Sequence, residues 1–297
     1  MRNKIFFLAF LPLFPTIVYS QSIAGPEPIS KIYKSLALIS RVPDAKRSYL
    51  DTITFPWKEY SRGAITNSLL RTVYLSQEDE ARLPSLISYP ANSSDQARAE
   101  LDYLLRLQET RTTDEIKRAE YIAEIGSTPS IVNPLDSEYA ANRNQLFYIA
   151  QNVGRSYNPE NFPATCRLLM NAIQDIRATE FRLKRFFKRP RPYHLESRLK
   201  PLARIGSPSF PSGHTLWAFT QAFLFSEIIP DKRKQFIQVA EEVRWSREVM
   251  GIHFPSDNEA SRIISWELIQ LWKTNPQFVF DLEQAKIEWE QNKNKFK

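Results

Sequence analysis

Residues 214–229 read HTLWAFTQAFLFSEII, and nearly every position of this stretch is apolar. A helix with one polar face lies at a surface, whereas a helix that is apolar on all sides is buried in a core. The stretch follows Pro211, Ser212 and Gly213, and a Ser-Gly pair is common at the start of helices. These residues predict a buried central helix that begins around His214.

The flanking segments have the periodicity of amphipathic helices. SSDQARAELDYLLRLQETRT, from residue 93, opens with a Ser/Asp cap and places its leucines on one broad helical face. Further helices are predicted near 31–40 and over 112–125, 134–152, 162–187, 231–250, 256–273 and 277–291. Alternating patterns with turn pairs, which would indicate strands, are hard to find. The sequence predicts an all-α fold, a single helical domain with a buried central helix after the PSGH motif.

Composition narrows the class of protein. The chain has 297 residues, 42% hydrophobic and 25% charged, which is ordinary for a globular protein with a substantial core. Only seven glycines occur, and no G-x-G-x-x-G or G-x-x-x-x-G-K-[ST] motif is present, which disfavours nucleotide-binding folds. The net charge of +7 favours anionic ligands but does not by itself indicate nucleic acid. Cys166 is the only cysteine, so no disulfide can form within the chain, and we expect it to be a small buried side chain.

The first twenty residues differ from the rest. MRNK is a short basic segment, and IFFLAFLPLFPTIVY is an apolar run with two prolines that ends near Ser20. This pattern is typical of a secretory signal peptide; a membrane anchor is the alternative, but the run is short and interrupted by proline. We therefore expect a signal peptide over 1–20, an N-terminal arm over 21–60 and a helical domain over 61–297. We also expect a periplasmic or secreted location and no stable membrane insertion, because no later stretch has the length of a transmembrane helix.

Three segments carry the residues suited to chemistry, and the first is KRFFKRPRPY at 184–193. A basic run of this kind can be a solvated or nucleic-acid-facing patch. Pro190 is expected to end the preceding helix and to leave Arg191 on a stiff, extended exit. Lys184 and Arg191 are then candidates for binding a phosphate group, with the guanidinium aimed for bidentate contact.

The second segment is SPSFPSGHTLWAF at 207–219. Ser212 and Gly213 lead directly into the central helix, so the free N–H groups of its first turn could hold an anion. Ser212 would add a hydroxyl donor, Gly213 would let the backbone approach closely, and His214 lies beside them. An ordinary N-cap with a structural histidine is the alternative interpretation.

The third segment is SREVMGIHFPSD at 246–257. Arg247 could contact a further face of the same anion. His253 and Asp257 have the spacing for an imidazole whose Nδ1–H is held by a carboxylate, which leaves Nε2 free to attack. The same pair could instead ligate a metal, but the chain has only three histidines and no H-E-x-x-H motif, so we expect no metal site.

Together the segments supply three cations, backbone amides and two histidines without a cluster of carboxylates. Stabilising the oxygens of a transferring phosphoryl group needs this set of donors. The pattern K184-x6-R191-P192, P211-S212-G213-H214 and S246-R247-x5-H253-x3-D257 resembles the three-part signature of the type 2 phosphatidic acid phosphatase superfamily. The chain is most similar to the bacterial class A non-specific acid phosphatases, although those usually carry GSYPSGHT where this chain has GSPSFPSGHT.

The resemblance implies a role for each matched residue. His253 would be the nucleophile that forms a phosphohistidine, and Asp257 would fix its tautomer. His214 would give a proton to the leaving alkoxide and later act as base for water. The non-bridging oxygens would be held by Lys184, Arg191, Ser212, Gly213 and Arg247. His194 matches no position of the signature, and we assign it no role.

The expected activity is that of an exported, metal-independent acid phosphatase that acts on small phosphomonoesters. The same site could bind vanadate as the cofactor of a haloperoxidase, or hydrolyse lipid phosphates or diphosphates. A non-catalytic protein that binds anions through its basic cluster is a further alternative, and its affinity would fall steeply with salt. Otherwise we expect no cofactor, no nucleic-acid partner and a possible homodimer.

Overall fold

The computed structural model describes residues 30–125, 135 and 137–296, and it is helical without a strand in these ranges. The expected signal peptide at 1–20 lies outside the described residues. The α-helices are α1 Lys31–Leu36, α2 Arg62–Asn67, α3 Gln77–Arg82, α4 Asp95–Thr110, α5 Thr113–Ile125, α6 Tyr139–Gln145, α7 Pro163–Phe187, α8 Pro192–Leu195, α9 Gly213–Ile228, α10 Arg233–Val249, α11 Pro255–Trp272 and α12 Pro276–Asn292. The 3-10 turns are η1 Ala45–Thr52, η2 Trp57–Glu59, η3 Leu83–Leu86, η4 Tyr148–Val153, η5 Pro230–Lys232 and η6 Lys293–Phe296.

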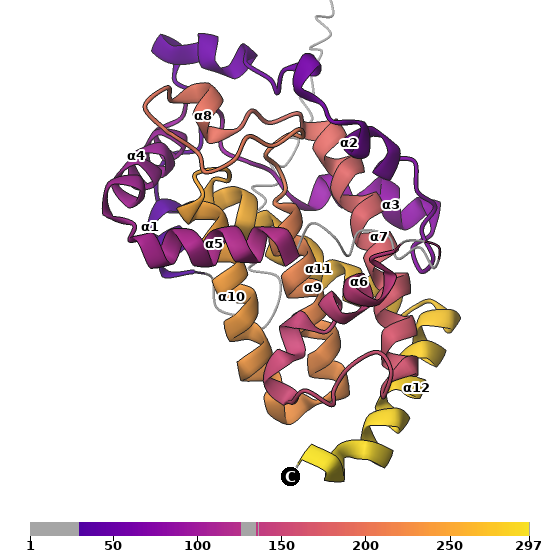
Figure 1. Ribbon diagram of the computed structural model, residues 1–297. Coiled ribbons are helices and arrows are strands. Elements are labelled where there is room, and N and C mark those ends of the chain that lie inside the picture. Colours follow the sequence, from indigo (N-terminus) through magenta and orange to yellow (C-terminus); the bar gives the residue numbers. More distant parts are fainter. Residues whose placement is uncertain (1–29, 126–134, 136, 297) are drawn as a thin grey trace, which may run out of the picture.

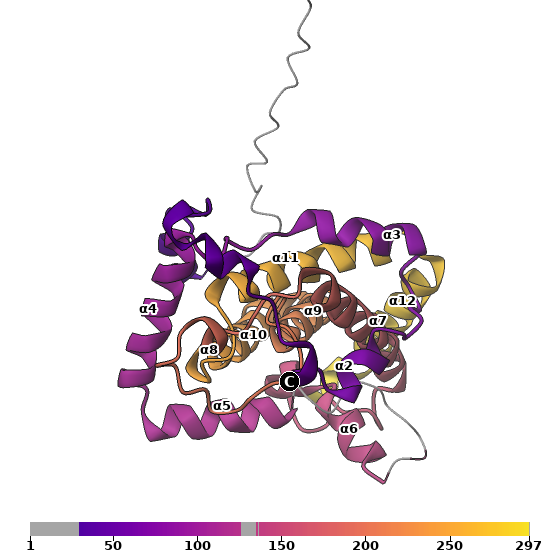
Figure 2. The same cartoon turned by 90° about the horizontal axis from the view of Figure 1, so that it is seen from above.

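The predicted central helix is confirmed as α9. Every side chain from Thr215 to Ser226 is buried, and the helix packs chiefly against α10 and α11. Figures 1 and 2 show α9 and α10 in the middle of the molecule, with the other long helices around them. A helix in this position has no face toward water, which explains why its sequence lacks a polar stripe.

Most of the surrounding helices lie where the sequence predicts them. The helix expected over 162–187 is α7, and a left-handed C-cap at Lys188 (φ 51°) ends it two residues before Pro190. The segment 134–152 differs from its prediction: in the described part a short α6 is followed by the 3-10 turn η4. Gly154 follows that turn with φ 142°, a conformation that only glycine adopts readily, so the helix cannot continue there.

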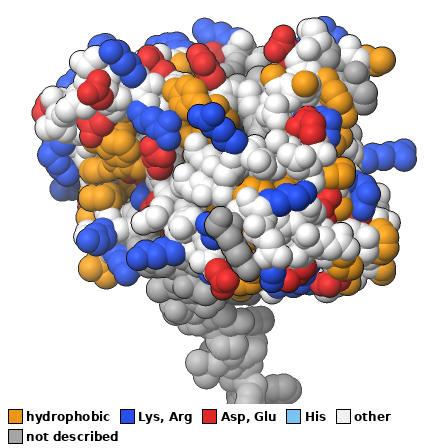
Figure 3. All heavy atoms as spheres, turned by 60° about the horizontal axis from the view of Figure 1, so that its bottom comes forward, with side chains coloured by type: hydrophobic (Ala, Val, Ile, Leu, Met, Phe, Trp, Pro, Cys, Tyr) orange, Lys and Arg blue, Asp and Glu red, His pale blue; other side chains and the backbone are white. Residues whose placement is uncertain are grey.

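Two apolar clusters hold the helices together. The larger one joins α7, α9, α10, α11 and α12, and it contains Cys166, which is buried as expected. The smaller one joins α4 and α5 to the end of α10 through Leu104, Ala119, Val249 and Phe254. On the face in Figure 3, positive, negative and hydrophobic side chains are interspersed. None of the helices in the described ranges is long and apolar enough to cross a membrane.

Candidate active site

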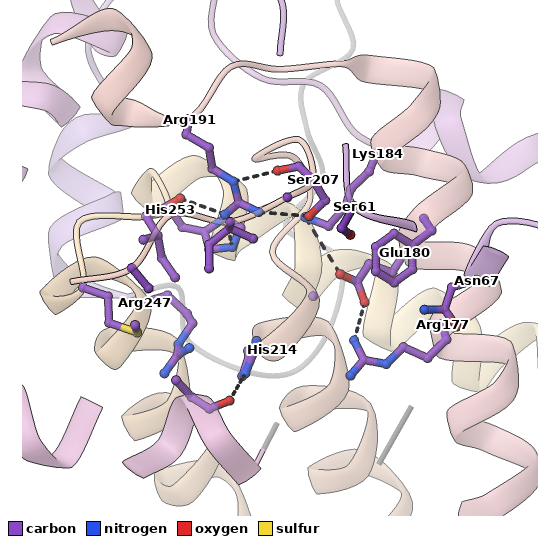
Figure 4. A pocket seen from close by; sticks show the side chains of 18 residues that line it. Ser61, Asn67, Arg177, Glu180, Lys184, Arg191, Ser207, His214, Arg247 and His253 are labelled. Carbon is purple, nitrogen blue, oxygen red and sulfur yellow. Dashed lines mark hydrogen bonds and ion pairs between the residues drawn. The ribbon is translucent and has the colours of Figure 1, made fainter. Parts of the chain in front are cut away.

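A cavity of about 290 Å³ opens at one end of the bundle, where α7 and α10 end and α9 and α11 begin. Six of the eight site residues predicted from sequence line it: Lys184, Arg191, Gly213, His214, Arg247 and His253. They come from three segments that are distant in the chain, and Figure 4 shows the side chains of the five labelled members, all but Gly213, around a common space. The end of the bundle therefore collects the three motifs into one pocket.

The nucleophile candidate His253 is held from both sides of its ring. Nδ1 lies 3.3 Å from Oδ2 of Asp257, and Nε2 lies 2.9 Å from Nη1 of Arg191. A guanidinium can only donate, so Nε2 accepts and the ring proton sits on Nδ1, facing the carboxylate. Burial, followed by the charge of Arg191, lowers the pKa of His253 well below its usual value. The ring is therefore kept neutral, with its lone pair on the cavity side.

Asp257 stays ionised although it is completely buried. Burial alone would raise its pKa, but Arg189 together with hydrogen bonds from His253 and Ser209 holds the pKa below its usual range. The peptide N–H of Phe254 also donates to Oδ2 at 2.9 Å. Because a carboxylate with several donors cannot rotate, it fixes both the plane and the tautomer of the histidine.

His214 occupies the first turn of α9, and its Nε2 lies 3.1 Å from the carbonyl oxygen of Ala123 in α5. Since a carbonyl only accepts, Nε2 carries a proton and Nδ1 is the atom that can gain or lose the second one. Burial, followed by the charge of Arg247, lowers the pKa of His214 well below its usual value. A bound phosphate would bring negative charge that opposes the effect of Arg247, and so favour the protonated ring.

Buried cations line the cavity: Lys184, Arg191 and Arg247 from the predicted motifs, and Arg177. Lys184 Nζ donates to the carbonyl oxygens of Pro208 and Pro211 at 2.8 and 2.7 Å, and burial together with Arg191 lowers its pKa to about 7. Arg247, whose pKa burial and Arg191 lower to about 9, donates to the hydroxyl of Ser246. Cations gathered around one buried cavity repel one another, and an anion placed between them relieves this repulsion.

Gly213 is required by a close contact with a residue that the sequence analysis missed. A Cβ at this position would lie only 2.0 Å from Oε1 of Glu180. Glu180 lines the cavity, pairs with Arg177 at 2.7 Å and lies 3.9 Å from Lys184 Nζ. Its position four residues before Lys184 on α7 was the available signal, because residues i and i+4 share a helix face.

Ser212 lies outside the cavity lining. Its hydroxyl donates to Oγ1 of Thr215 at 3.0 Å, and its peptide N–H donates to the carbonyl of Asp257 at 3.3 Å. Contact between this hydroxyl and a bound phosphate would require the bond to Thr215 to break. The structure thus gives Ser212 a part in joining α9 to α11.

A second residue that sequence reasoning missed, Arg189, lies behind the site. Its side chain is fully buried, with Nη1 2.6 Å from Asp257 Oδ1 and Nη2 3.4 Å from Glu100 Oε2. The guanidinium also lies over the rings of Phe254 and Tyr89, 3.9 and 4.8 Å from their centroids. Only the fold could reveal this role, because Glu100 comes from α4, 89 residues earlier in the chain.

His194, to which the sequence gave no role, supports Arg191. Its Nδ1 accepts the peptide N–H of Arg191 at 3.1 Å, and Nε2 contacts Glu59 at 3.1 Å. Arg191 has the extended conformation expected after Pro190 (φ −72°, ψ 157°). The guanidinium is further fixed by the carbonyl oxygens of Ser207 and Ile252, both at 2.9 Å. Arg191 is therefore rigidly aimed into the cavity.

Comparison with known proteins finds similarities to the segment that contains the cavity. A model described as "PAP2 superfamily" matches residues 164–280. Over 81 residues the chain is 35% identical to a non-specific acid phosphatase of Providencia stuartii, covering 27% of this chain and 33% of that protein. Over 151 residues it is 28% identical to a non-specific acid phosphatase of Salmonella typhi. This alignment covers 48% of this chain and 59% of that protein.

The chain thus spans between one third and three fifths of the length of these curated relatives. Among solved structures, a match titled "Crystal structure of the first transmembrane PAP2 type phosphatidylglycerolphosphate phosphatase from Bacillus subtilis" is 18% identical, with a TM-score of 0.42 over 72% of this chain and 96% of the other. The family match contains every site residue predicted from sequence, from Lys184 to Asp257. The matched segment covers less than half of the chain, and over it the chain is similar to the PAP2 superfamily and to bacterial non-specific acid phosphatases.

Proposed function

We propose that this chain is a phosphomonoesterase of the acid phosphatase type, working through a phosphohistidine. One observation carries the proposal: a neutral imidazole, His253, directs its unprotonated nitrogen into a pocket lined by Lys184, Arg191 and Arg247. A neutral nucleophile facing several cations suits attack on a phosphate dianion. The sequence relatives named acid phosphatases support the same reaction.

In the first step, Nε2 of His253 attacks phosphorus and the bond from phosphorus to the ester oxygen breaks. The phosphate oxygens compete with Nε2 for the Nη1 donor of Arg191, which frees the lone pair of Nε2. His214 gives its Nδ1 proton to the leaving oxygen, which departs as an alcohol. Asp257 stabilises the positive charge that develops on His253.

In the second step, water attacks the phosphohistidine and the bond from phosphorus to nitrogen breaks. His214, now neutral, accepts a proton from this water and returns to its charged form. The products are inorganic phosphate and free His253. The cycle is balanced without a redox partner, and we propose that it needs no metal ion and no other cofactor.

We further propose that the protein is exported, on the basis of the signal-like sequence at 1–20. Small phosphomonoesters outside the cytoplasm would then be its substrates. This part of the proposal is independent of the chemistry. Cell fractionation of the expressed chain, followed by N-terminal sequencing, tests it.

The chemistry is tested by hydrolysis of para-nitrophenyl phosphate in excess EDTA, with the wild-type chain and with His253→Ala. We expect turnover in EDTA, inhibition by vanadate, and a radiolabelled, acid-labile phosphoenzyme that the variant does not form. Full activity of the folded His253→Ala variant would overturn the mechanism. Loss of activity in EDTA that added metal restores would overturn the metal-independent reaction.

A further inference from the structure

A second, smaller pocket of about 70 Å³ lies beside the catalytic cavity. Its wall is formed by η2 and α2 on one side and by α7 on the other, through Trp57, Tyr60, Ile65, Phe181 and Arg185. The segment 57–68 lies outside the family match at 164–280. The mechanism described above uses none of these side chains.

The two pockets share a wall. Phe181 and Lys184 line both of them, and the segment 57–68 also contributes to both, since Ser61 and Asn67 face the catalytic cavity. The ammonium of Lys184 is fixed by the carbonyl oxygens of Pro208 and Pro211, so its aliphatic stem is held in place as part of the partition. The stem of Lys184 and the ring of Phe181 therefore border both the phosphate site and the side pocket.

The chemical character of the two pockets differs. The side pocket is lined mainly by aromatic and aliphatic side chains, and none of the described residues around it is acidic. Trp57 is 74% exposed and Ile65 is 40% exposed, so apolar surface faces water directly beside a strongly charged site. The ring of Tyr60 packs between those of Phe55 and Trp57, and its centroid lies 5.1 Å from each of theirs. These contacts hold the Trp57 ring in place. An apolar ligand group is what such a surface favours.

We infer that this side pocket is a subsite for the leaving group, and that it selects phosphomonoesters of flat, apolar alcohols, above all aromatic ones. The inference rests on the proposed phosphatase function and adds its substrate class. An aromatic ring can lie against Trp57 and Phe181 while its phosphate is held by Lys184 and Arg191. Arg185 at the pocket can lie over the face of the same ring.

The direction of the reaction agrees with this placement. In an in-line displacement the leaving oxygen departs on the side opposite the attacking nitrogen. Figure 4 shows His253 on one side of the cavity and Lys184 with Ser61 on the other, with His214 below them. The leaving oxygen must also reach Nδ1 of His214, so the inference places that oxygen at His214 and only its organic group along the wall of Lys184 and Phe181.

The test compares 1-naphthyl phosphate with glycerol 2-phosphate as substrates of the wild-type chain and of Trp57→Ala. We expect kcat/KM for the naphthyl ester to fall about threefold to tenfold, the size of one aromatic contact, and kcat/KM for the glycerol ester to change less than about twofold. Trp57→Phe, which keeps a ring, should restore most of the loss. Phe280→Ala, which removes an exposed aromatic side chain from α12, is the matched control and should affect neither ester.

Binding of benzylphosphonate and methylphosphonate, measured by calorimetry, separates this inference from the function on which it rests. If neither ester is hydrolysed but Trp57→Ala weakens benzylphosphonate alone, the subsite stands and the phosphatase proposal fails. If both esters are hydrolysed and Trp57→Ala changes them equally or not at all, the phosphatase stands and the subsite is refuted. Equal affinity of the wild-type chain for the two phosphonates would also refute the subsite.

Discussion

Replacing Arg189 with Met would test whether the buried charges behind the site are held as a unit. Its guanidinium lies between Asp257 and Glu100, and all three side chains are completely buried. Removing one partner from a buried ion pair costs about 3–5 kcal/mol, because the remaining charge loses its compensation. Met fills a similar volume and adds no polar group, so the loss of charge dominates the expected effect.

The loss in free energy of unfolding caused by Arg189→Met should be larger at high pH than at low pH. Burial raises the pKa of Glu100 to about 7, so in the native wild-type protein this group is charged at pH 8 and neutral at pH 5.5. A raised pKa in the folded state contributes stability at low pH that is lost as the pH rises through about 7. Without Arg189 the pKa of Glu100 rises further. The destabilisation should therefore be about 3–5 kcal/mol at pH 8 and smaller at pH 5.5, by at most about 1.4 kcal/mol, because pH 8 lies only one unit above the wild-type pKa of about 7.

Urea unfolding followed by tryptophan fluorescence at both pH values would measure these free energies. Lys188→Met removes an exposed cation from the same segment and serves as the matched control, with an expected change within about 0.5 kcal/mol. Adding Glu100→Gln to Arg189→Met should recover part of the loss at pH 8, because one uncompensated carboxylate is removed. The reasoning would be refuted if Arg189→Met lowered the free energy of unfolding by less than about 1 kcal/mol at pH 8 and by the same amount at pH 5.5.

Three further predictions concern the cavity. His253→Ala should lower kcat for para-nitrophenyl phosphate by more than about 10⁴-fold and His214→Ala by about 10²–10⁴-fold; a loss below tenfold in either folded variant would contradict its role. Because burial and Arg191 lower the pKa of Lys184 to about 7, its charge is present below that pH and lost above it. Inhibition by sulfate, whose own charge is constant, should therefore weaken between pH 6 and 9, whereas a flat profile would contradict this. Gly213→Ala should cost about 1–3 kcal/mol in urea unfolding, since its Cβ would lie 2.0 Å from Glu180, and an unchanged free energy would show that Glu180 moves freely.

Local sequence determined most of the helices and the order of the site segments. The apolar run at 214–229 specified the buried helix α9, because a helix without a polar face has no stable place at a surface. Pro190 and Pro255 fixed where α7 ends and α11 begins, since proline cannot continue one helix but suits the first turn of another. The spacing of His253 and Asp257 was sufficient to place their side chains together, because the two residues lie one helical turn apart.

Tertiary structure decided which distant groups support those residues. Arg189 meets Glu100 across 89 positions, and Trp57 reaches the wall of Lys184 from the N-terminal segment. Ser212, suited by sequence to bind phosphate, instead donates its hydroxyl to Thr215. Hydrophobic periodicity and capping residues in the sequence predict contacts within one helix, whereas contacts between helices depend on how the whole core packs. The sequence alone therefore predicted the candidate reacting groups and their order, and the packing of α4, α7 and the 57–68 segment decided which side chains hold them and which lie beside them.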